Sequence, residues 1–480
     1  MKAIKRILLG ASFGLAAGLA GAQTGQLVTL ANFNGTNGWF PYGGMIVGSD
    51  GVLYGTTYEG GTNNTGALFR LTTDGTFTSF DPFPAYVSDA GRSVNGTGGY
   101  PYAGLALGAD GGLYGVASSG GTNATGTFFR TTTNGVLAVP FTFANLGTNA
   151  AGSTVDTNTT GAAPEGRLVL AADGNFYGTS HGGGSQGKGT VFRLTTNGIF
   201  TKLVELNGTN GANPEAGLTA GGDGNFYGVT YFGGANNNGS IFRITTNGSL
   251  ASLYSFSALV ATAGFAYTNA DGANPAGDLR LGGDGLLYGT CHGGGTYGYG
   301  MVFKVTTSGQ FTPLVSFNTT NGAYPLGALT VGPNGNLYGV TPGGGTKVVG
   351  VIYELTPAGS LNLLFSFDPV VSNGSTLTNG TGAYPYAPLT LAPDGSFYGT
   401  TTSGGAGGRG TVFRFTMAST PPRLQIQPLA GAVVLRWTNA AFSLQSAPQV
   451  AGTFSTVSGA TSPYTNPITG NRQFFRLLGN

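Results

Sequence analysis

Short stretches of alternating apolar and polar residues recur along most of the chain, separated by Asp-Gly, Gly-Gly and Asn-Gly pairs. Within one unit, Gly-Leu-x-Leu, Leu/Phe-Tyr-Gly and Val-Phe-Arg-Leu-Thr each predict a short β-strand, and a fourth strand follows, as at 311–317. Asp-Gly and Asn-Gly supply the positive φ angles that two-residue hairpin turns require. The pattern therefore predicts units of four antiparallel strands.

The phrase Asp-Gly-x-Leu/Phe-Tyr-Gly, with small variations, marks seven such units. Its tyrosines are Tyr54, Tyr114, Tyr177, Tyr227, Tyr288, Tyr338 and Tyr398. In the first six units, the distance from the opening proline to the glycine of the last turn is constant, as from Pro41 to Gly75 or from Pro325 to Gly359. All variation in length lies in the connection that follows this glycine. Four-stranded units of about 50 residues are typical of the blades of a β-propeller.

We therefore predict an all-β fold, a seven-bladed β-propeller of four-stranded antiparallel blades. The seventh unit has three strands and lacks the fourth. Residues 25–41 align without a gap with 309–325, so the strand 27–33 is expected to pair along 412–415 and close the ring. A second grouping, in which the fourth-strand sequence opens each unit, also gives seven full units and stays open.

The two ends of the chain differ from the repeats. Basic residues, an apolar stretch and Ala20-Gly21-Ala22 predict a signal peptide at 1–22. The domains are then 23–418 for the propeller and 419–480 for a small C-terminal β-sandwich-like module. That module is interpreted as an accessory domain, with surface attachment as the alternative. The protein is expected to be secreted to the exterior or cell surface, with the periplasm as the alternative.

The recurring DGxLYGTT…GG…GTVFRLTxxG pattern resembles that of the bacterial secreted proteins that carry the GloVer tandem repeat. The resemblance covers residues 25–416. It implies a secreted repeat protein and brings no catalytic residues to transfer. The chain departs from many such proteins because it lacks a terminal apolar anchor followed by basic residues.

Composition and charge limit the classes of function that the chain can have. Charged residues make up 8% of the chain, and the mature protein has a net charge near zero, which does not favour nucleic-acid binding. No stretch after the signal holds the roughly 18 apolar residues of a membrane span. The single cysteine, Cys291, excludes an internal disulfide and is read as a buried small residue. We expect a monomer without a cofactor.

Few residues suit metal or acid-base chemistry. His181 and His292 occupy equivalent loop positions, but zinc requires three or four converging ligands, so no metal site is predicted. The aspartates of the Asp-Gly turns each lie alone, unlike the clustered ligands of a calcium loop.

These aspartates vary together with a basic residue on the third strand, and only the sixth unit differs, with Asn334 and Glu354. We predict a recurring ion pair or turn-bracing hydrogen bond worth about 1 kcal/mol where partly buried. The pairs are Asp50 and Arg70, Asp110 and Arg130, Asp173 and Arg193, Asp223 and Arg243, Asp284 and Lys304, and Asp394 and Arg414.

Residues around each opening proline predict a binding surface on the face that carries the long loops. Units 6, 7, 1 and 2 have aromatic residues there, and units 3 and 4 have acidic ones. The candidates are Trp39, Tyr42, Tyr102, Glu165, Glu215, Tyr324 and Tyr386. Such a surface suits a glycan or cell-surface partner. The alternative is that the aromatics only fill gaps between blades.

Two functions follow. The first is a non-catalytic binding or structural scaffold outside the cell, whose ligand the sequence does not name. The second is a polysaccharide-active lyase or hydrolase whose acids converge only in the fold, with Glu165 and Glu215 as the pair that keeps this option open.

Overall fold

The computed structural model describes residues 25–89, 91–148, 154–262, 267–374, 376–417, 424–429, 432–437, 442–449, 453–467 and 473–479. The predicted signal peptide, residues 1–22, lies outside this range. The chain separates into two compact units, unit 1 (Met1–Thr416) and unit 2 (Met417–Asn480). All regular elements in the described residues are β-strands, and no helix there could cross a membrane.

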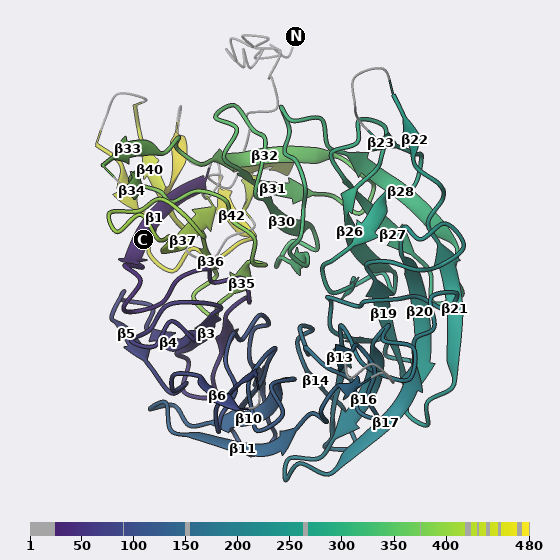
Figure 1. Ribbon diagram of the computed structural model, residues 1–480. Coiled ribbons are helices and arrows are strands. Elements are labelled where there is room, and N and C mark those ends of the chain that lie inside the picture. The colour runs from purple at the N-terminus through teal and green to yellow at the C-terminus, as the bar shows by residue number, and fades with distance from the viewer. Residues whose placement is uncertain are drawn as a thin grey trace, which may run out of the picture. The chain divides into compact units, whose positions relative to one another are not determined.

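Unit 1 contains seven sheets of four or more strands, which follow one another around a common centre (Figure 1). The first strands of these sheets are β2 (Ile46–Val47), β8 (Ala106–Leu107), β14 (Val169–Leu170), β18 (Thr219–Ala220), β25 (Arg280–Leu281), β29 (Thr330–Val331) and β35 (Thr390–Leu391). The second strands are β3 (Leu53–Thr57), β9 (Leu113–Ala117), β15 (Phe176–Ser180), β19 (Asn225–Thr230), β26 (Leu287–Gly293), β30 (Leu337–Thr341) and β36 (Phe397–Thr400).

The third strands are β4 (Ala67–Leu71), β10 (Thr127–Thr131), β16 (Thr190–Leu194), β20 (Ser240–Thr245), β27 (Met301–Val305), β31 (Val351–Leu355) and β37 (Thr411–Met417). The fourth strands are β5 (Phe77–Phe80), β11 (Leu137–Thr142), β17 (Phe200–Glu205), β21 (Leu250–Ser255), β28 (Phe311–Ser316), β32 (Leu361–Ser366) and, in the last sheet, β1 (Gly25–Asn32). The fifth sheet also holds β24 (Ala273–Pro275), which pairs with β26. Each of the seven units thus gives one sheet.

The last sheet takes its fourth strand from the start of the chain. Its order is β1-β37-β36-β35, with hydrogen bonds between neighbours. Just after β1, the Phe33 N–H donates to the Gly410 carbonyl at 2.9 Å. The seventh unit has no fourth strand of its own among the residues that the structure describes, and the N-terminal strand occupies that place.

The glycine that follows the repeat tyrosine makes room for a ring on the next strand. A Cβ at Gly55 would lie 2.4 Å from the Phe69 ring, and the equivalent glycine of every other unit meets the ring of its own third strand in the same way. Phe69 is 1% exposed. Because the tip of each ring occupies the space above a glycine, a side chain there would displace the ring from the buried second and third strands.

Buried side chains from neighbouring units form shared cores. Tyr54 and Leu68 of the first unit pack with Leu105 and Phe129 of the second. The first and last units share a core in the same way, in which Phe33 lies between residues of both, such as Met45 and Tyr398. Threonine hydroxyls join the sheets as well, from Thr390 to the Met45 carbonyl at 2.7 Å and from Thr400 to the Pro41 carbonyl at 3.0 Å.

The predicted pairing of turn acid and basic residue takes different forms among the units. Among the described residues it forms an ion pair only between Asp110 and Arg130, at 3.0 Å on a half-exposed surface. The recurring partner of the acid is instead the repeat tyrosine, whose hydroxyl donates to it at 2.6–2.9 Å in six units. The other carboxylate oxygen accepts the N–H two residues later, as at Val52. Both oxygens are therefore engaged without the basic residue.

Several basic residues of this set make other contacts. Arg70 lies over the Phe80 ring, Lys304 donates to the Pro357 carbonyl, and Arg414 donates to the Thr73 carbonyl of the first unit. Exposed pairs of this kind contribute about 0–1 kcal/mol. The recurring partner of the turn aspartate is therefore the repeat tyrosine.

The sixth unit shows why its two differences occur together. Its turn has Asn334, which cannot act as the acid, and Glu354 on β31 provides the carboxylate instead. The Tyr338 hydroxyl donates to Glu354 at 2.8 Å, and the Asn334 and Asn336 amides donate to the same oxygen at 3.0 and 2.7 Å. In the sixth unit the carboxylate therefore lies on the third strand instead of in the turn, and the hydroxyl of the buried Tyr338 still has an acceptor.

Replacing Glu354 by alanine is expected to lower the free energy of unfolding by about 2–3 kcal/mol, because three donors lose a buried acceptor. Urea denaturation measures the loss. The double variant Asn334→Asp/Glu354→Arg restores the arrangement of the other units and should lie within about 1 kcal/mol of the natural protein. A double variant as unstable as Glu354→Ala would contradict this account.

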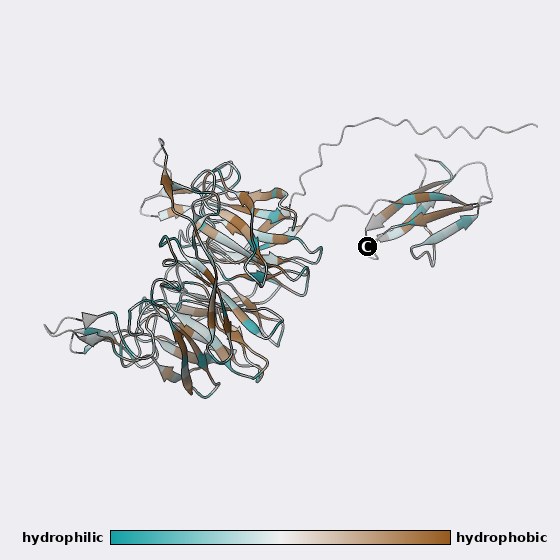
Figure 2. Ribbon diagram, turned by 90° about the vertical axis from the view of Figure 1, so that its right-hand side faces the viewer, coloured by the Kyte–Doolittle hydropathy of each residue, from teal (hydrophilic) through white to brown (hydrophobic). Residues whose placement is uncertain are grey.

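The four long connections between units form two-stranded hairpins. They are β6 (Val87–Asp89) with β7 (Arg92–Val94), β12 (Gly147–Thr148) with β13 (Thr154–Val155), β22 (Val260–Ala261) with β23 (Tyr267–Thr268), and β33 (Val371–Asn373) with β34 (Thr376–Thr378). In the side view of Figure 2, hairpins project from one side of unit 1. The length variation seen in the sequence therefore lies in these hairpins.

Unit 2 consists of two three-stranded sheets. Their orders are β38-β39-β42 and β41-β40-β43. The strands are β38 (Gln425–Leu429), β39 (Ala432–Arg436), β40 (Phe442–Ala447), β41 (Ser455–Thr456), β42 (Tyr464–Pro467) and β43 (Phe474–Gly479). Leu435, Trp437 and Leu444 form its small core.

Candidate ligand-binding site

A cavity of about 460 Å³ lies where the first strands of unit 1 begin. The residue directly after each opening proline contributes one side chain to its wall. These seven residues, here called the first layer, are Tyr42, Tyr102, Glu165, Glu215, Ala276, Leu326 and Tyr386. The volume lies within the range of small-molecule sites.

The first layer has three sectors of different chemistry. Tyr386, Tyr42 and Tyr102 come from the seventh, first and second units, and their rings touch, with centroids 5.5 Å apart for Tyr42 and Tyr386 and 5.2 Å for Tyr42 and Tyr102. Glu165 and Glu215 come from the third and fourth units, and small or aliphatic residues complete the layer. Flat rings beside carboxyl groups can stack on a sugar ring and hydrogen-bond its hydroxyls.

The residue before each opening proline has a left-handed backbone conformation in every unit. The φ angles are +54° at Phe40, +56° at Tyr100, +48° at Ala163, +51° at Asn213, +55° at Asn274, +59° at Tyr324 and +57° at Tyr384. This conformation is strained for residues with a Cβ. Two hydrogen bonds hold it at Ala163, whose N–H donates to Thr125 of the preceding unit while its carbonyl accepts from His181. The strained residue thus fixes the segment that carries the first layer and leads into the first strand.

Ala163→Gly is expected to raise the free energy of unfolding by about 1 kcal/mol, since glycine adopts this φ without a steric cost. Ala162→Gly next to it is the control, and it should be neutral or destabilising because no positive φ is relieved there. Thermal unfolding of the three proteins tests this. A stabilisation by both substitutions, or by neither, would contradict the strain.

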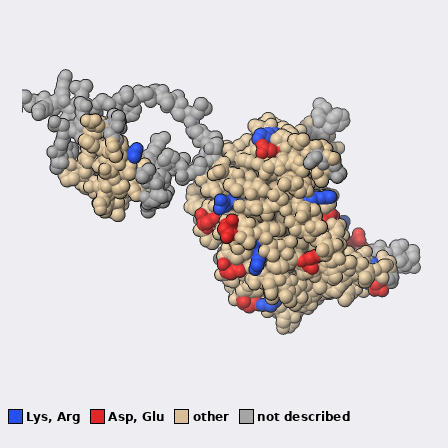
Figure 3. Space-filling view, turned by 90° about the vertical axis from the view of Figure 1, so that its left-hand side faces the viewer, with Lys and Arg blue, Asp and Glu red and all other residues tan. Residues whose placement is uncertain are grey.

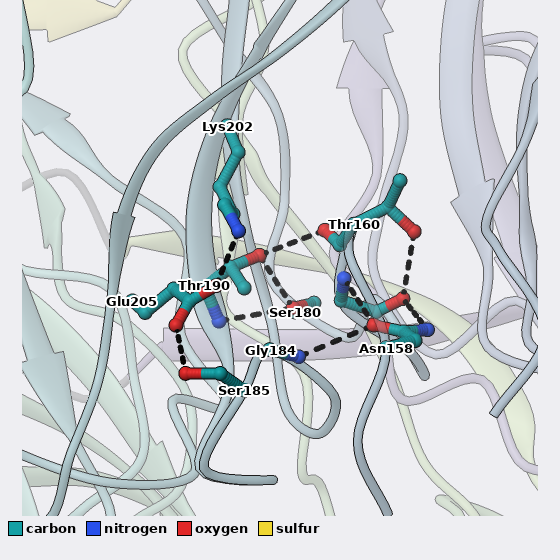
Figure 4. Close-up of polar contacts among 9 residues, drawn as sticks. Asn158, Thr160, Ser180, Gly184, Ser185, Thr190, Lys202 and Glu205 are labelled. Carbon is teal, nitrogen blue, oxygen red and sulfur yellow. Dashed lines mark hydrogen bonds and ion pairs between the residues drawn. The ribbon is translucent and has the colours of Figure 1, made fainter. Parts of the chain in front are cut away.

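Connections of the third unit are held by side-chain hydrogen bonds (Figure 4). Asn158 donates to the Gly161 carbonyl at 2.7 Å and accepts from the N–H groups of Gly161 and Gly184. Glu205 accepts from both Ser185 and Lys202. The polar groups of these loops are therefore engaged within the protein.

The polar groups of the first layer differ from those of the loops. Within the described part of the chain, none of the side chains of Tyr42, Tyr102, Glu165, Glu215 and Tyr386 has a hydrogen-bond partner in the protein. All five are half-buried. Converging polar groups without internal partners are typical of a site that a ligand completes.

Burial changes the acid-base properties of this layer. Desolvation raises the pKa of Glu165 to about 7, and the charge of Glu215 adds to the shift. Desolvation also raises the pKa of Glu215 to about 7 and that of Tyr42 to about 12. Near neutral pH the two carboxyl groups are therefore partly protonated and able both to donate and to accept hydrogen bonds.

The structure thus brings together five of the seven candidate residues and separates two. Trp39 stacks on Phe40 and lies beneath the Arg409 guanidinium, 3.6 Å from the ring centroid. Tyr324 is 40% exposed and lies beside His292, with ring centroids 5.2 Å apart. Neither lines the cavity. The binding role of all seven stays a prediction.

Sequence reasoning missed a second set of residues in the cavity. Arg167, Asp278 and Arg280, here called the charged layer, lie two or four positions after Glu165 and Ala276 of the first layer. Arg167 and Asp278 form an ion pair at 3.6 Å, and Asp278 also accepts the Gly217 N–H at 2.6 Å. The charged residues that follow the first-layer positions 165 and 276 in the sequence are the signal that could have revealed this layer.

The remaining reactive groups lie apart from this chemistry. Cys291 is fully buried, and burial raises its pKa well above the usual thiol range. Burial lowers the pKa of both His181 and His292. Among the described residues, no three His, Cys, Asp or Glu side chains are placed to hold a metal ion.

Comparison with known families identifies the family of the repeat. The model of the Gloeobacter/Verrucomicrobia repeat matches residues 19–160, 152–266 and 259–381, which is most of the chain. The chain belongs to the Gloeobacter/Verrucomicrobia repeat family. This confirms the resemblance drawn from the repeated phrase, and the first six sheets contain the family's matched segments.

Solved structures resemble this member of the repeat family in fold. A streptogramin B lyase matches with a TM-score of 0.51 at 17% identity, over 82% of this chain and 98% of its own. A virginiamycin B lyase from Staphylococcus aureus matches with a TM-score of 0.47 at 16% identity, over 82% and 99%. A search of curated proteins found no match.

Proposed function

We propose that this member of the repeat family is a secreted, seven-bladed β-propeller that binds a saccharide without transforming it. The observation that carries the proposal is the cavity, where three tyrosine rings and two carboxyl groups converge without partners in the protein. Stacking on aromatic rings and hydrogen bonds from carboxyl groups together suit the alternating apolar and hydroxyl-bearing faces of a sugar.

The closed ring of seven blades is part of this proposal. Its support is the sheet order β1-β37-β36-β35, together with the hydrogen bonds from Thr390 and Thr400 to the first unit. Closure would place the aromatic sector of units seven, one and two on one continuous wall. It also leaves no free sheet edge, which protects a protein of many strands from aggregation.

Secretion rests on the leader pattern of residues 1–22 and on the surface chemistry. The few charged side chains are scattered over a largely uncharged surface (Figure 3). A surface of this kind offers little attraction to nucleic acid. The extracellular space, where polysaccharides are abundant partners, is the proposed location.

A glycan-array screen of the mature protein tests the proposal. The Tyr42→Ala/Tyr102→Ala variant should lose at least tenfold in affinity for the saccharides retained by the natural protein. Tyr267→Ala, at an exposed hairpin position, is the control and should bind normally. Absence of any retained saccharide, or equal binding by the cavity variant, would refute the proposed function.

A polysaccharide lyase or hydrolase is the second candidate. The observation that favours it is the pair of carboxyl groups with pKa values of about 7, since a general acid works best when its pKa is near the working pH. Incubating the protein with each saccharide retained on the array, followed by mass analysis of the products, separates the two functions. Products that disappear with Glu165→Gln would establish the enzyme.

A further inference from the structure

We propose that the saccharide bound in this cavity is acidic, and that its carboxylate or sulfate group pairs with Arg280. The inference rests on the proposed function and adds the chemical class of the ligand. It arises from the charged layer, which the tyrosines and glutamates of the first layer do not explain.

Arg280 begins β25 (Arg280–Leu281), four residues after Ala276 of the first layer, and the chain bends at Gly277 between them. Both levels line the same cavity. A ligand that contacts both levels therefore has one end at the tyrosines and the other at Arg280.

The charged layer has one positive charge without a partner. Arg167 and Asp278 neutralise each other at 3.6 Å, and the second oxygen of Asp278 is engaged by the Gly217 N–H. Arg280 has no hydrogen bond or ion pair with any described residue, although it lines the cavity. A guanidinium group left free in a cavity is suited to a carboxylate or sulfate, which it can hold through two parallel hydrogen bonds.

The surroundings of Arg280 act on its charge in both directions. Desolvation and the positive charge of Arg167 lower the pKa of Arg280, the negative charge of Asp278 raises it, and the group stays protonated. A bound anion would offset the first two effects. The Arg280 side chain is exposed at the cavity, so salt should weaken its pairing with an anion.

The same charges orient the ligand. Glu165 and Glu215 line the first layer and would repel an anionic group placed there. The acidic group is therefore directed to the charged layer, and neutral hydroxyl groups face the carboxyls and tyrosines. The two layers together select a saccharide with its acidic group at one end.

Two kinds of saccharide carry an acidic group that can pair with Arg280, a uronic acid and a sulfated sugar. Tetragalacturonic acid and its methyl ester form one matched pair of probes, and a sulfated carrageenan tetrasaccharide and its desulfated form make the other. Isothermal titration of the mature protein with all four identifies the source. Preference for either acidic member over its neutral partner, by tenfold or more, is the expected result.

Variants then connect the preference to Arg280. Arg280→Gln should abolish the preference, and Arg280→Lys should restore part of it because the charge returns. Arg243→Gln is the matched control, since Arg243 lies on β20 outside the cavity. Thermal unfolding of each variant verifies that it is folded.

The outcomes separate the two proposals. If saccharides bind and the tyrosine variant weakens them, but acidic and neutral partners bind equally or Arg280→Gln keeps the preference, this inference is wrong and the proposed function stands. If no saccharide binds the natural protein, on the array or in titration, the proposed function and this inference both fail.

Discussion

Replacing Glu165 and Glu215 together by glutamine is expected to stabilise the protein at pH 8 by about 3–5 kcal/mol. Burial raises the pKa of each carboxyl from its usual 4.5 to about 7 in the folded state. The folded protein therefore holds these protons more tightly than the unfolded chain. The natural protein should be most stable below pH 4.5 with respect to these groups, lose stability as the pH rises to about 7, and lose no more above it.

Urea denaturation at pH 5, 6, 7 and 8 measures this effect, and Glu205→Gln is the control. Hydrogen bonds from Lys202 and Ser185 lower the pKa of Glu205, so its removal should destabilise the protein at pH 8. At pH 8 the double variant should therefore be more stable than the natural protein, and Glu205→Gln should be less stable. A double variant no more stable than the natural protein at pH 8 would show that the cavity carboxyls are fully solvated.

Phe33→Ala is expected to lower the free energy of unfolding by about 3–5 kcal/mol. Phe33 is fully buried, and its ring meets Phe69 and Phe77 of the first unit edge-on, with centroids 5.5 and 5.8 Å away. It follows directly after β1 in the sheet of the last unit. Its loss therefore weakens the contact through which the first and last units hold each other.

Phe317→Ala is the matched control, because Phe317 aligns with Phe33 and is equally buried within consecutive units of the chain. Calorimetry should give comparable losses for both variants if the first and last units meet as closely as any other neighbours. A loss below about 1 kcal/mol for Phe33→Ala alone would contradict the closed ring.

Much of the fold was predictable because the repeat fixes where turns and strands fall. The opening proline marks an equivalent position in each unit. The sequence alone therefore predicted that the residues directly after it lie together, as these do: Tyr42, Tyr102, Tyr386, Glu165 and Glu215. The strained φ of the residue before each proline was not predictable. Residues before proline normally prefer extended conformations, and only contacts with two units hold them otherwise.

The joint variation of turn acid and basic residue has a physical cause. It indicated direct contact, but it arises through a third residue, the repeat tyrosine, which needs one carboxylate in every unit. The charged layer was missed for another reason. Arg167 and Asp278 come from the third and fifth units, and a Cβ at Gly217 of the unit between them would lie 2.1 Å from the Arg167 carbonyl oxygen.

The central claim is that the cavity is a preformed, partly desolvated binding site. The chain has only five glutamates, Glu59, Glu165, Glu205, Glu215 and Glu354, so selective carbon-13 labelling of their carboxyl groups gives five resonances that NMR can follow with pH. The account predicts that two of them, assigned with Glu165→Gln and Glu215→Gln, titrate near pH 7 and move when a saccharide retained on the array is added. Titration of both near pH 4.5, without change on addition of the saccharide, would contradict it.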